Sequence, residues 1–452
     1  MINIPHIGVI ADDLTGATTT GVLLARSGAK TAVFFNEEAA KTNSNLSSLD
    51  AILISSNSRA LPQDEAYEKV SEAIKALQSM NVSFFSKRID TTMRGGIGVE
   101  IDAMLDYMDE ETVAIVVPAM PQSKRILVGG YSIIDSVALV DTPVAQDVRT
   151  PVLENYIPKL LDGQSRRKIG SVTLENILSG KTEIKKALKM ARHSGADIIV
   201  VDAVTLDHIE LIAKACLELK WNILAVDPGP FTSKLAFCRK LIHEEKDNIP
   251  VETADESGKF VLIAAGSASP VTKRQMEVLC QDNRHKRVSI DPIALIDGGN
   301  IALKEVDITL EHVKSIFKNE NPRAILLETA LHGELLDLDF EDKKRGYASG
   351  MSANRINAGL GNIVARIIEA LGRDKIAGIY TTGGDTMVNV CYQLEVECIE
   401  VIDYVIPQTD VCRMLGKYQG LPIIGKGGLT GNESIVLDIV DRLFKEASRK
   451  NK

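Results

Sequence analysis

Short apolar runs alternate with segments of helical periodicity along most of the chain. Ten of these runs are rich in β-branched residues, and nearly all end in a polar or glycine-bearing turn, so we expect them to be strands. They lie at 7–11, 51–55, 82–85, 113–117, 197–201, 222–226, 260–264, 324–327, 376–380 and 421–424. Strands that alternate with helices are typical of an α/β fold with mainly parallel sheets.

One stretch interrupts this alternation. Residues 244–259 are charged, contain Pro250 and show little apolar periodicity, which predicts a linker. A chain of 452 residues is also too long for one typical core. We therefore expect two domains, each with a mainly parallel sheet covered by helices, at residues 1–245 and 260–452, with a linker at 246–259.

The composition narrows the range of functions. The net charge of -9 comes without a basic tail or basic helix, which argues against a nucleic-acid or anionic-membrane surface. An anionic substrate must therefore be bound by local cations. The six cysteines are dispersed, without C-x-x-C or a zinc-type pattern, and are expected to be reduced thiols. No signal peptide or apolar run of membrane-spanning length is recognisable, so the cytoplasm is the expected location.

The densest polar chemistry lies at residues 87–100. This stretch follows the apolar run at 82–85 and precedes Ile97 and Ile101, which begin a helix face, so it is predicted to be a strand-to-helix crossover. In open α/β sheets ligands collect at such crossovers, and the free N–H groups at the helix start favour an anion. Residues 119–164, with several prolines and glycines and weak periodicity, are predicted to be an elaborated loop region over a site.

The side chains of the 87–100 stretch suit a small polyol acid. Three cations would hold a carboxylate, one carboxylate would bind hydroxyl groups, and glycines would allow close approach of the backbone. The residues concerned are Lys87, Arg88 and Arg94, then Asp90, then Gly95 and Gly96. An ordinary solvated loop with a helix cap is the alternative interpretation.

Two other predicted strands of the N-terminal half end in comparable turns. Asp12 and Asp13 follow the strand at 7–11, where they could hold a magnesium ion, bind substrate hydroxyls or cap the next helix. Arg59 follows the strand at 51–55, and its planar guanidinium could pair with a carboxylate. Arg59 gains weight as a candidate because its turn would lie beside the other two in a parallel sheet.

The C-terminal half contains three glycine-rich turns that follow predicted strands. They lie at residues 266–272, 383–386 and 425–431. Each could be a plain tight turn, but three of them predict a cradle of backbone N–H groups for phosphates. None fits the P-loop pattern, and no strand is followed by G-x-G-x-x-G. The seven histidines form no H-x-x-x-H pair and are expected to be surface or structural residues.

Together these blocks resemble the four-carbon acid sugar kinase family. The matching residues are 11–16 (ADDLTG), 58–59 (SR), 87–95 (KRIDTTMRG), 266–272 (GSASPVT), 383–386 (GGDT) and 426–428 (KGG). They keep the order of the family and span nearly the whole chain. The resemblance implies a sugar-acid-binding N-terminal domain, a nucleotide-binding C-terminal domain, and ATP-dependent phosphorylation of threonate, erythronate or 3-oxo-tetronate at the terminal hydroxyl.

The resemblance also implies roles for individual residues. Substrate contacts are implied for Asp12, Arg59, Lys87, Arg88, Ile89 and Asp90. ATP contacts are implied for Ser267, Gly383, Gly384, Asp385, Thr386 and Gly428. From the residue pattern itself, the same two sites are expected to include Asp13, Thr91, Arg94, Ser269 and Gly427. The family usually has serine in place of Thr91 and phenylalanine in place of Leu429.

We therefore predict a phosphoryl transferase that uses ATP and Mg²⁺ and acts on a sugar acid. Arg59, Lys87 and Arg94 would hold the substrate carboxylate. Asp12 or Asp90 would orient the terminal hydroxyl and accept its proton, as the catalytic residue of the reaction. The sequence does not decide between these two aspartates, and it assigns no metal ligands.

Two other functions remain open. The altered glycine block at 427–430 is compatible with a non-catalytic regulatory relative that binds a sugar acid and a nucleotide. Asp12 and Asp13 could instead belong to a metal-dependent aldolase or hydrolase, which would leave the three glycine turns without a role. The sequence does not determine the stereochemistry of the acid or the oligomeric state, for which a homodimer is one candidate.

Overall fold

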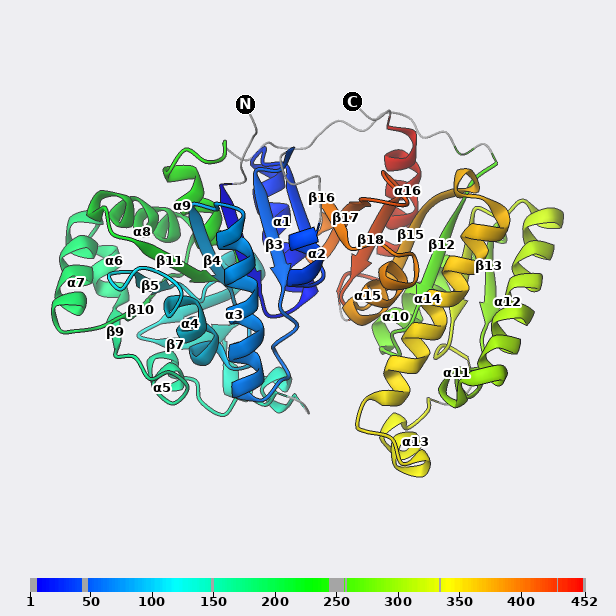
Figure 1. Cartoon of the computed structure of the whole chain (residues 1–452), viewed down its shortest axis with the longest axis horizontal. Coiled ribbons are helices and arrows are strands. Elements are labelled where there is room, and N and C mark those ends of the chain that lie inside the picture. The colour runs from blue at the N-terminus through cyan, green and yellow to red at the C-terminus, as the bar shows by residue number, and fades with distance from the viewer. Residues whose placement is uncertain are drawn as a thin grey trace. The chain divides into compact units, whose positions relative to one another are not determined.

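The computed structural model describes residues 6–42, 48–147, 150–243, 256, 258–332, 335–428 and 430–449. The chain divides into two compact units, Met1–Asp247 and Asn248–Lys452 (Figure 1). Each is an α/β unit in which helices cover a mainly parallel sheet, as the sequence predicts. The boundary falls within the predicted linker at 246–259, most of which lies outside the described residues.

The N-terminal unit is built on a sheet whose described strand pairs are all parallel. The strand order is β2-β3-β1-β4-β11-β5-β10-β9. In this order the strands are Thr31–Phe34, Ala51–Ser55, Ile7–Ala11, Phe84–Arg88, Ile223–Asp227, Val113–Val116, Ile198–Val201 and Ile169–Val172. Strands β1, β3, β5, β10 and β11 are buried along their whole length, as expected for a parallel sheet covered on both faces.

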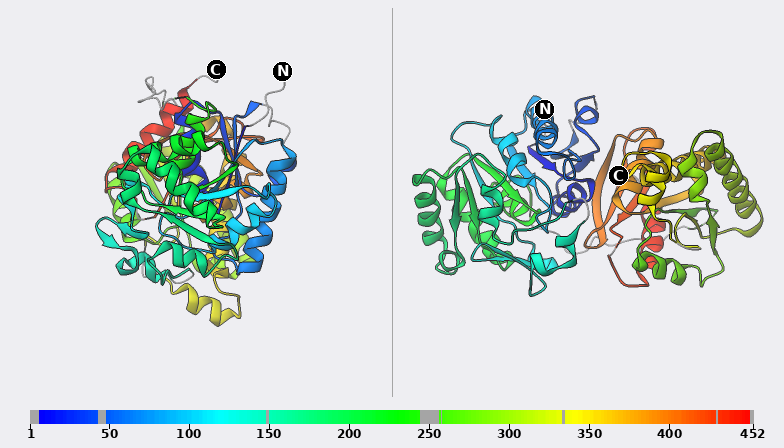
Figure 2. Two further views of the ribbon diagram at one scale, coloured as in Figure 1. Left: turned by 90° about the vertical axis from the view of Figure 1, so that its left-hand side faces the viewer. Right: turned by 90° about the horizontal axis from the view of Figure 1, so that it is seen from below.

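Two groups of helices cover this sheet, one on each face (Figure 2). One group is α2, α3 and α4, at Glu37–Thr42, Gln63–Ser79 and Ile97–Leu105, with α5 at Ile157–Asp162 packed against α4. The other is α1, α6, α7, α8 and α9, at Leu14–Arg26, Leu174–Leu178, Lys181–His193, Leu206–Leu219 and Pro230–Cys238. Helix α4 begins where the sequence predicts a helix face, and its residues Ile97 and Ile101 are buried.

The region at 119–164 has more regular structure than a loop. It contains a small antiparallel sheet of β6, β7 and β8, at Arg125–Val128, Tyr131–Ile134 and Val137–Ala138. The buried carboxylate of Asp202 anchors the hairpin, because it accepts hydrogen bonds from the amides of Gly129 at 2.6 Å and Gly130 at 2.9 Å. A buried anchor of this kind fixes the hairpin relative to the main sheet.

The C-terminal unit has the strand order β13-β14-β12-β15-β18-β17-β16. In this order the strands are His285–Ser289, Ala324–Glu328, Phe260–Ala265, Ile376–Thr382, Pro422–Lys426, Thr409–Met414 and Cys398–Ile406. Strand β17 is antiparallel to both neighbours, whereas the other described pairs are parallel. The sheet is therefore mainly parallel, with one antiparallel strand, β17, between β18 and β16.

Helices cover this second sheet as well. Helices α10 and α16, at Pro270–Leu279 and Ile435–Ser448, pack together on one face. The remaining helices are α11, α12, α13, α14 and α15, at Pro292–Asp297, Gly299–Glu320, Leu338–Arg345, Met351–Leu371 and Gly384–Gln393. Helix α14 contacts α11, α12, α13 and α15, so these helices form one layer.

All ten predicted strands are present, although their ends differ. One difference affects the site: the strand predicted at 82–85 is β4, Phe84–Arg88, so Lys87 and Arg88 are strand residues and do not belong to the crossover turn. Strands β2, β9, β13, β16 and β17 and the small sheet are not predicted from the sequence. Strand β13 lacks an apolar run because it is an edge strand, in which His285 and Val288 alone are buried.

The structure also tests the predictions about cysteines and membrane-spanning segments. All six cysteines are free thiols, and four of them are buried. No helix in the described part of the chain is both long and apolar enough to cross a membrane. The expected cytoplasmic location stays a prediction.

Candidate active site

A cluster of charged side chains lies where three neighbouring strands of the N-terminal sheet end. Strands β3, β1 and β4 are adjacent and parallel, so the turns that follow them meet at one edge. These turns bring together Asp12 after β1, Arg59 after β3 and Asp90 after β4. The sequence predicts this convergence from the order of the blocks and the parallel sheet.

Arg59 is the centre of this cluster. Its Nε donates to Asp12 Oδ2 at 2.6 Å, and its Nη1 lies 2.6 Å from Asp13 Oδ2. Its Nη2 lies 3.7 Å from Asp90 Oδ1. One planar guanidinium therefore bridges three carboxylates, a geometry that the compact ammonium of lysine does not provide.

The turn after β4 is closed by Asp90. Its carboxylate accepts hydrogen bonds from the hydroxyl of Thr92 and from Arg94, whose Nε lies 2.8 Å from Oδ2. Met93 adopts a left-handed backbone conformation with φ 59°, stabilised by the hydrogen bond from its amide to the carbonyl of Asp90 at 3.1 Å. These bonds hold Arg94 beside Arg59 at the end of the strand.

Arg88, at the end of β4, completes the inner side of the cluster. Its Nη1 donates to Asp12 Oδ1 at 3.3 Å and lies 3.6 Å from Asp13 Oδ1. A Cβ atom at Gly16 would collide with this guanidinium, so the glycine of the ADDLTG block makes room for Arg88. Asp13 is the N-cap of α1 and accepts the amide of Gly16 at 2.7 Å.

Three of the predicted substrate residues, Lys87, Ile89 and Thr91, are buried in the protein. Lys87 is fully buried, and its ammonium lies 2.6 Å from Glu100 Oε2. Ile89 and Thr91 are also buried, and the amide of Ile89 donates to the carbonyl of Asp227 at 3.1 Å. Direct substrate contacts by these three residues stay predictions.

The pKa values of the three aspartates differ. Burial alone would raise the pKa of Asp12, but the charges of Arg59 and Arg88 outweigh it and lower that pKa below its ordinary value. The pKa of Asp90 is lowered in the same way, against burial, by Arg59 and Arg94. Burial dominates at Asp13, whose pKa is raised even though Arg59 opposes the shift.

The charged side chains of the cluster also differ in their exposure to solvent. The side chains of Asp12 and Asp90 are 4% and 6% exposed, whereas that of Asp13 is 29% exposed. Arg59 and Arg94 are 16% and 24% exposed. Asp13, Arg59 and Arg94 are therefore the members of the cluster that a ligand from solvent can reach.

Two further charged residues belong to this cluster and are not predicted from the sequence. Asp147, from the 119–164 region, accepts a hydrogen bond from Arg94 Nη1 at 3.3 Å. Arg125, at the start of β6, has a lowered pKa because it is buried, although the nearby charge of Asp90 opposes this effect. Its buried Nε has no hydrogen-bond partner within the described part of the chain. The region at 119–164, which the sequence predicts to lie over a site, thus reaches the cluster, although no pattern singled out these two residues.

The C-terminal unit brings the three predicted glycine turns together. Ser269 is the N-cap of α10, and its hydroxyl donates to the carbonyl of Gly428 at 2.6 Å. The amide of Gly383 donates to the carbonyl of Lys426 at 2.9 Å. The amide of Ser267 donates to Thr382 Oγ1 at 3.1 Å. Each turn is thus hydrogen-bonded to another turn or to the strand that precedes one.

Glycine is required at two places in these turns. Gly383 has φ 98°, in the left-handed region that side chains disfavour, and it directly precedes α15. A Cβ atom at Gly428 would lie 2.9 Å from Ser267 Oγ. Gly384, Asp385 and Thr386 form the first turn of α15, whose N–H groups have no partner within the helix. Gly427 follows β18 directly.

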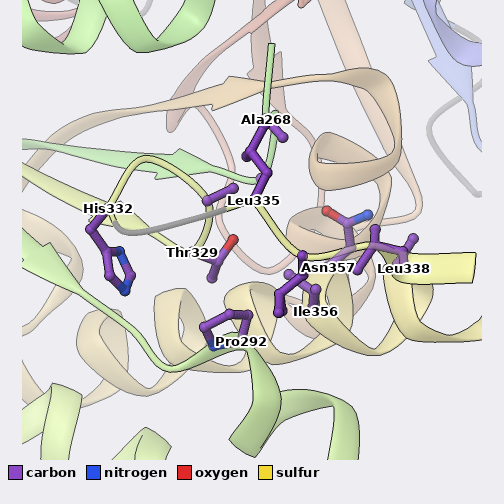
Figure 3. Close-up of a pocket in the computed structure, with 12 residues that line it drawn as sticks. Ala268, Pro292, Thr329, His332, Leu335, Leu338, Ile356 and Asn357 are labelled. Atoms are coloured by element: carbon purple, nitrogen blue, oxygen red, sulfur yellow. The ribbon is translucent and has the colours of Figure 1, made fainter. Parts of the chain in front are cut away.

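A cavity of about 350 Å³ opens beside these turns (Figure 3). Its lining is mostly apolar and includes Gly266, Ala268, Pro292, Leu335, Leu338 and Ile356. Asn357 also lines the cavity, and its Oδ1 accepts a hydrogen bond from the hydroxyl of Thr386 at 2.8 Å. An apolar cavity of this size with few polar groups is typical of a small-molecule site.

His332 lines the same cavity and is held by Glu328. Glu328 is fully buried, and His332 Nδ1 lies 2.9 Å from its Oε1. The carboxylate also accepts hydrogen bonds from Arg287 at 2.8 Å and Ser289 at 2.7 Å. Because a carboxylate only accepts, Nδ1 of His332 carries the proton and its Nε2 edge remains for the cavity and solvent. No motif in the sequence singles out this pair.

A resident metal ion finds no site among these residues. No group of three or more His, Cys, Asp or Glu in the described part of the chain could hold one. Asp12 and Asp13, the candidates from the sequence, face Arg59 and Arg88. This pairing does not fit the metal-dependent aldolase or hydrolase interpretation, which needs these carboxylates as ligands.

Both halves of the chain match models of known domains. Residues 7–235 match the model of a sugar-binding N-terminal domain, and residues 262–436 match that of a nucleotide-binding C-terminal domain. The chain is 35% identical to D-erythronate kinase of Heliobacterium modesticaldum, over 98% of both chains. It is 29% identical to D-threonate kinase of Salmonella typhimurium, over 95% of this chain and 96% of the relative. The chain belongs to the four-carbon acid sugar kinase family.

Solved structures agree with this fold. A Salmonella typhimurium protein superposes with a TM-score of 0.78 at 20% identity, over 98% of this chain and 99% of that chain. A Haemophilus influenzae protein gives a TM-score of 0.73 at 22% identity, over 97% and 98%. At these identities the likeness shows the fold alone.

Proposed function

We propose that the protein is an ATP-dependent kinase that phosphorylates the terminal hydroxyl of a four-carbon sugar acid. The observation that carries this proposal is the match to D-erythronate kinase over 98% of both chains. D-erythronate is therefore the first acid to test, followed by D-threonate and 3-oxo-tetronates, on which other relatives act by name.

The N-terminal cluster would bind the acid. Arg59 and Arg94 are partly exposed and would pair with the substrate carboxylate, since a guanidinium fork matches that group. Asp12 and Asp90 are more deeply buried and hydrogen-bond these two arginines, so they would fix the two forks in place. Lys87 would stabilise this end of the sheet through its buried ion pair with Glu100.

Asp13 joins Asp12 and Asp90 as a candidate for the general base. It is the most exposed of the three carboxylates and the one whose pKa is raised. A base with a higher pKa accepts the hydroxyl proton more readily, while all three carboxylates remain ionised when the pH lies well above their pKa values. We therefore place the proton transfer at an Asp13 carboxylate oxygen.

The C-terminal unit would bind the nucleotide. The apolar cavity would take the flat base, with His332 at its edge. The adjoining glycine turns and the first turn of α15 would bind the phosphates through backbone N–H groups. Mg²⁺ would enter with ATP as part of the substrate, where it neutralises phosphate charge.

The direct test is ADP release by the purified protein with Mg²⁺ and ATP across D- and L-erythronate, D- and L-threonate and 3-oxo-tetronates. We expect acid-dependent ADP release, with a product heavier than the acid by one phosphate group. Thr91 and the block at 427–430 depart from the usual family pattern, and Leu429 lies outside the described residues. ATP binding without acid-dependent ADP release would contradict the proposal and indicate a non-catalytic relative.

A further inference from the structure

Lys426 is a buried lysine of the C-terminal unit, beside one of the three glycine turns. It is the last residue of β18, directly before Gly427 and Gly428, and it is 2% exposed. Its ammonium donates hydrogen bonds to the carbonyls of Gly427 at 2.7 Å and Thr430 at 3.1 Å. Both partners belong to the same glycine turn.

No carboxylate compensates this charge. Within the described part of the chain, Lys426 forms no ion pair, although buried lysines are almost always paired. Burial lowers the pKa of Lys426 to about 8 and is the only cause of the shift. The charged residues of the surrounding elements do not contribute to this shift in pKa; they are Lys273, Arg274 and Glu277 of α10, Asp385 of α15, and Asp410 and Arg413 of β17.

The bonds of Lys426 also orient the turn. The carbonyls of Gly427 and Thr430 point to the ammonium, and the carbonyl of Gly428 accepts from the hydroxyls of Ser269 and Thr272 at 2.6 and 3.3 Å. The amide of Gly428 has no acceptor among the described residues. The carbonyls of Gly427, Gly428 and Thr430 are thus occupied by the protein, while the amide of Gly428 is left for an anion.

We propose that the Lys426 ammonium is the cation that stabilises the nucleotide phosphates at the Gly427–Gly428 turn, with the phosphates as its missing counter-ion. This inference rests on the proposed function and deepens it, since it names the charge that the nucleotide site uses. A buried, uncompensated charge costs free energy in the free protein, and an anion that binds at the turn recovers part of that cost. Lys426 therefore favours a ligand with phosphates over one without them.

The alternative is that Lys426 only stabilises the conformation of the turn and does not interact with phosphate. In that case, replacing Lys426 would weaken every ligand of the site equally, whether or not it carries phosphate. Adenosine and ATP share the base and ribose and differ in the phosphates, so their relative affinities separate the two roles. Lys304, an exposed lysine of α12, offers a control with the same change in charge.

The experiment measures equilibrium binding of Mg-ATP and of adenosine to the full chain and to its K426M and K304M variants. For K426M we expect ATP affinity to fall by at least about tenfold, as for the loss of a charge-assisted contact, with adenosine affinity unchanged within about twofold. K304M should match the unmodified protein for both ligands. Equal losses of ATP and adenosine in K426M, or no loss of ATP, would overturn the inference.

A second readout does not depend on how well the variant folds. Because binding of phosphate favours the charged form of Lys426, Mg-ATP binding to the unmodified protein at pH 8 should take up about half a proton. Calorimetry in two buffers of different ionisation enthalpy measures this uptake, which K426M should lack. Absence of proton uptake in the unmodified protein would overturn the inference.

Both readouts are independent of catalysis. If the protein binds ATP with these properties but phosphorylates no acid, the kinase proposal fails and the role of Lys426 stands. If the unmodified protein does not bind ATP, both fail.

Discussion

The two units place very different chemistry at the ends of their parallel strands. The N-terminal edge holds four arginines and four aspartates that pair with or lie beside one another: Arg59, Arg88, Arg94 and Arg125, and Asp12, Asp13, Asp90 and Asp147. The described residues of the three C-terminal turns carry only two charged side chains, Asp385 and Lys426. The first edge is neutralised within the protein, whereas the second offers hydroxyls and backbone N–H groups.

Two buried lysines show the same contrast. Lys87 ends next to Glu100 at 2.6 Å and is neutralised within the fold. Lys426 bonds to backbone carbonyls alone among the described residues, so its charge is not neutralised by the protein. Under the proposed function, the network of fixed charges would position the small polyol acid, and the phosphates of the nucleotide would complete the charge balance at the turn that Lys426 precedes.

Replacing Arg59 should have the largest effect on activity. In R59M the three carboxylates that share its guanidinium lose their common partner, so we expect kcat/KM for the acid to fall by about 10³-fold. R59K retains the positive charge without the planar fork, so its kcat/KM should lie between those of the unmodified protein and R59M. Steady-state ADP release measures the effect; near-normal turnover in R59M would show that the cluster is not the acid site.

Replacing the two lysines should change stability unequally. K87M leaves the buried carboxylate of Glu100 without a cation beside it, although the hydroxyl of Ser58 still donates to it, and should lower the free energy of unfolding by about 3 to 5 kcal/mol. The double variant K87M/E100M removes both charges and should recover most of that loss. K426M leaves no buried carboxylate behind and should be destabilised less than K87M. Urea unfolding compares the variants, and equal losses in K87M and K426M would contradict the distinction.

The role of Asp13 predicts a pH dependence. Its pKa is raised, so the carboxylate becomes protonated, and kcat/KM is lost, as the pH falls through a value above the ordinary range of aspartate. D13N keeps the oxygen that caps α1 but cannot accept the proton, so kcat should fall by about 10²-fold or more with helix α1 intact. A pH–rate profile with no acid limb above that range would argue for Asp12 or Asp90.

The smallest predicted effect is at the edge of the cavity. H332A removes one side chain from a lining that is mostly apolar, so ATP affinity should fall by about two- to tenfold, as for the loss of a single hydrogen bond. H312A, at an exposed position of α12, is the matched control. Fluorescence titration with a nucleotide analogue would measure both, and equal affinities in the two variants would place the base elsewhere.

Local patterns were sufficient for much of the fold. The ten apolar runs predicted strands because buried parallel strands carry continuous apolar sequence, and Ile97 and Ile101 predicted α4 by their spacing. Edge strands such as β13 escaped because partial solvent exposure allows polar side chains there. The end of β4 was misjudged because Lys87 and Arg88 are charged, yet both are buried in ion pairs that the sequence cannot display.

The candidate sites show the same limit. Asp12, Arg59 and Asp90 could be grouped from sequence because each follows a strand of one parallel sheet. Asp147 and Arg125 could not, since they reach the cluster through a hairpin that Asp202 anchors. Lys87 and Lys426 are both basic residues at the end of a strand, and the sequence does not show that a carboxylate lies beside the first and not beside the second among the described residues.

The division of labour between the two units can be tested by one set of calorimetric titrations, in which D-erythronate and Mg-ATP are each bound to R59M and to K426M. We predict that R59M loses affinity for D-erythronate and binds Mg-ATP normally, while K426M loses affinity for Mg-ATP and binds D-erythronate normally. Loss of both ligands in each variant, or the reverse pattern, would contradict the account.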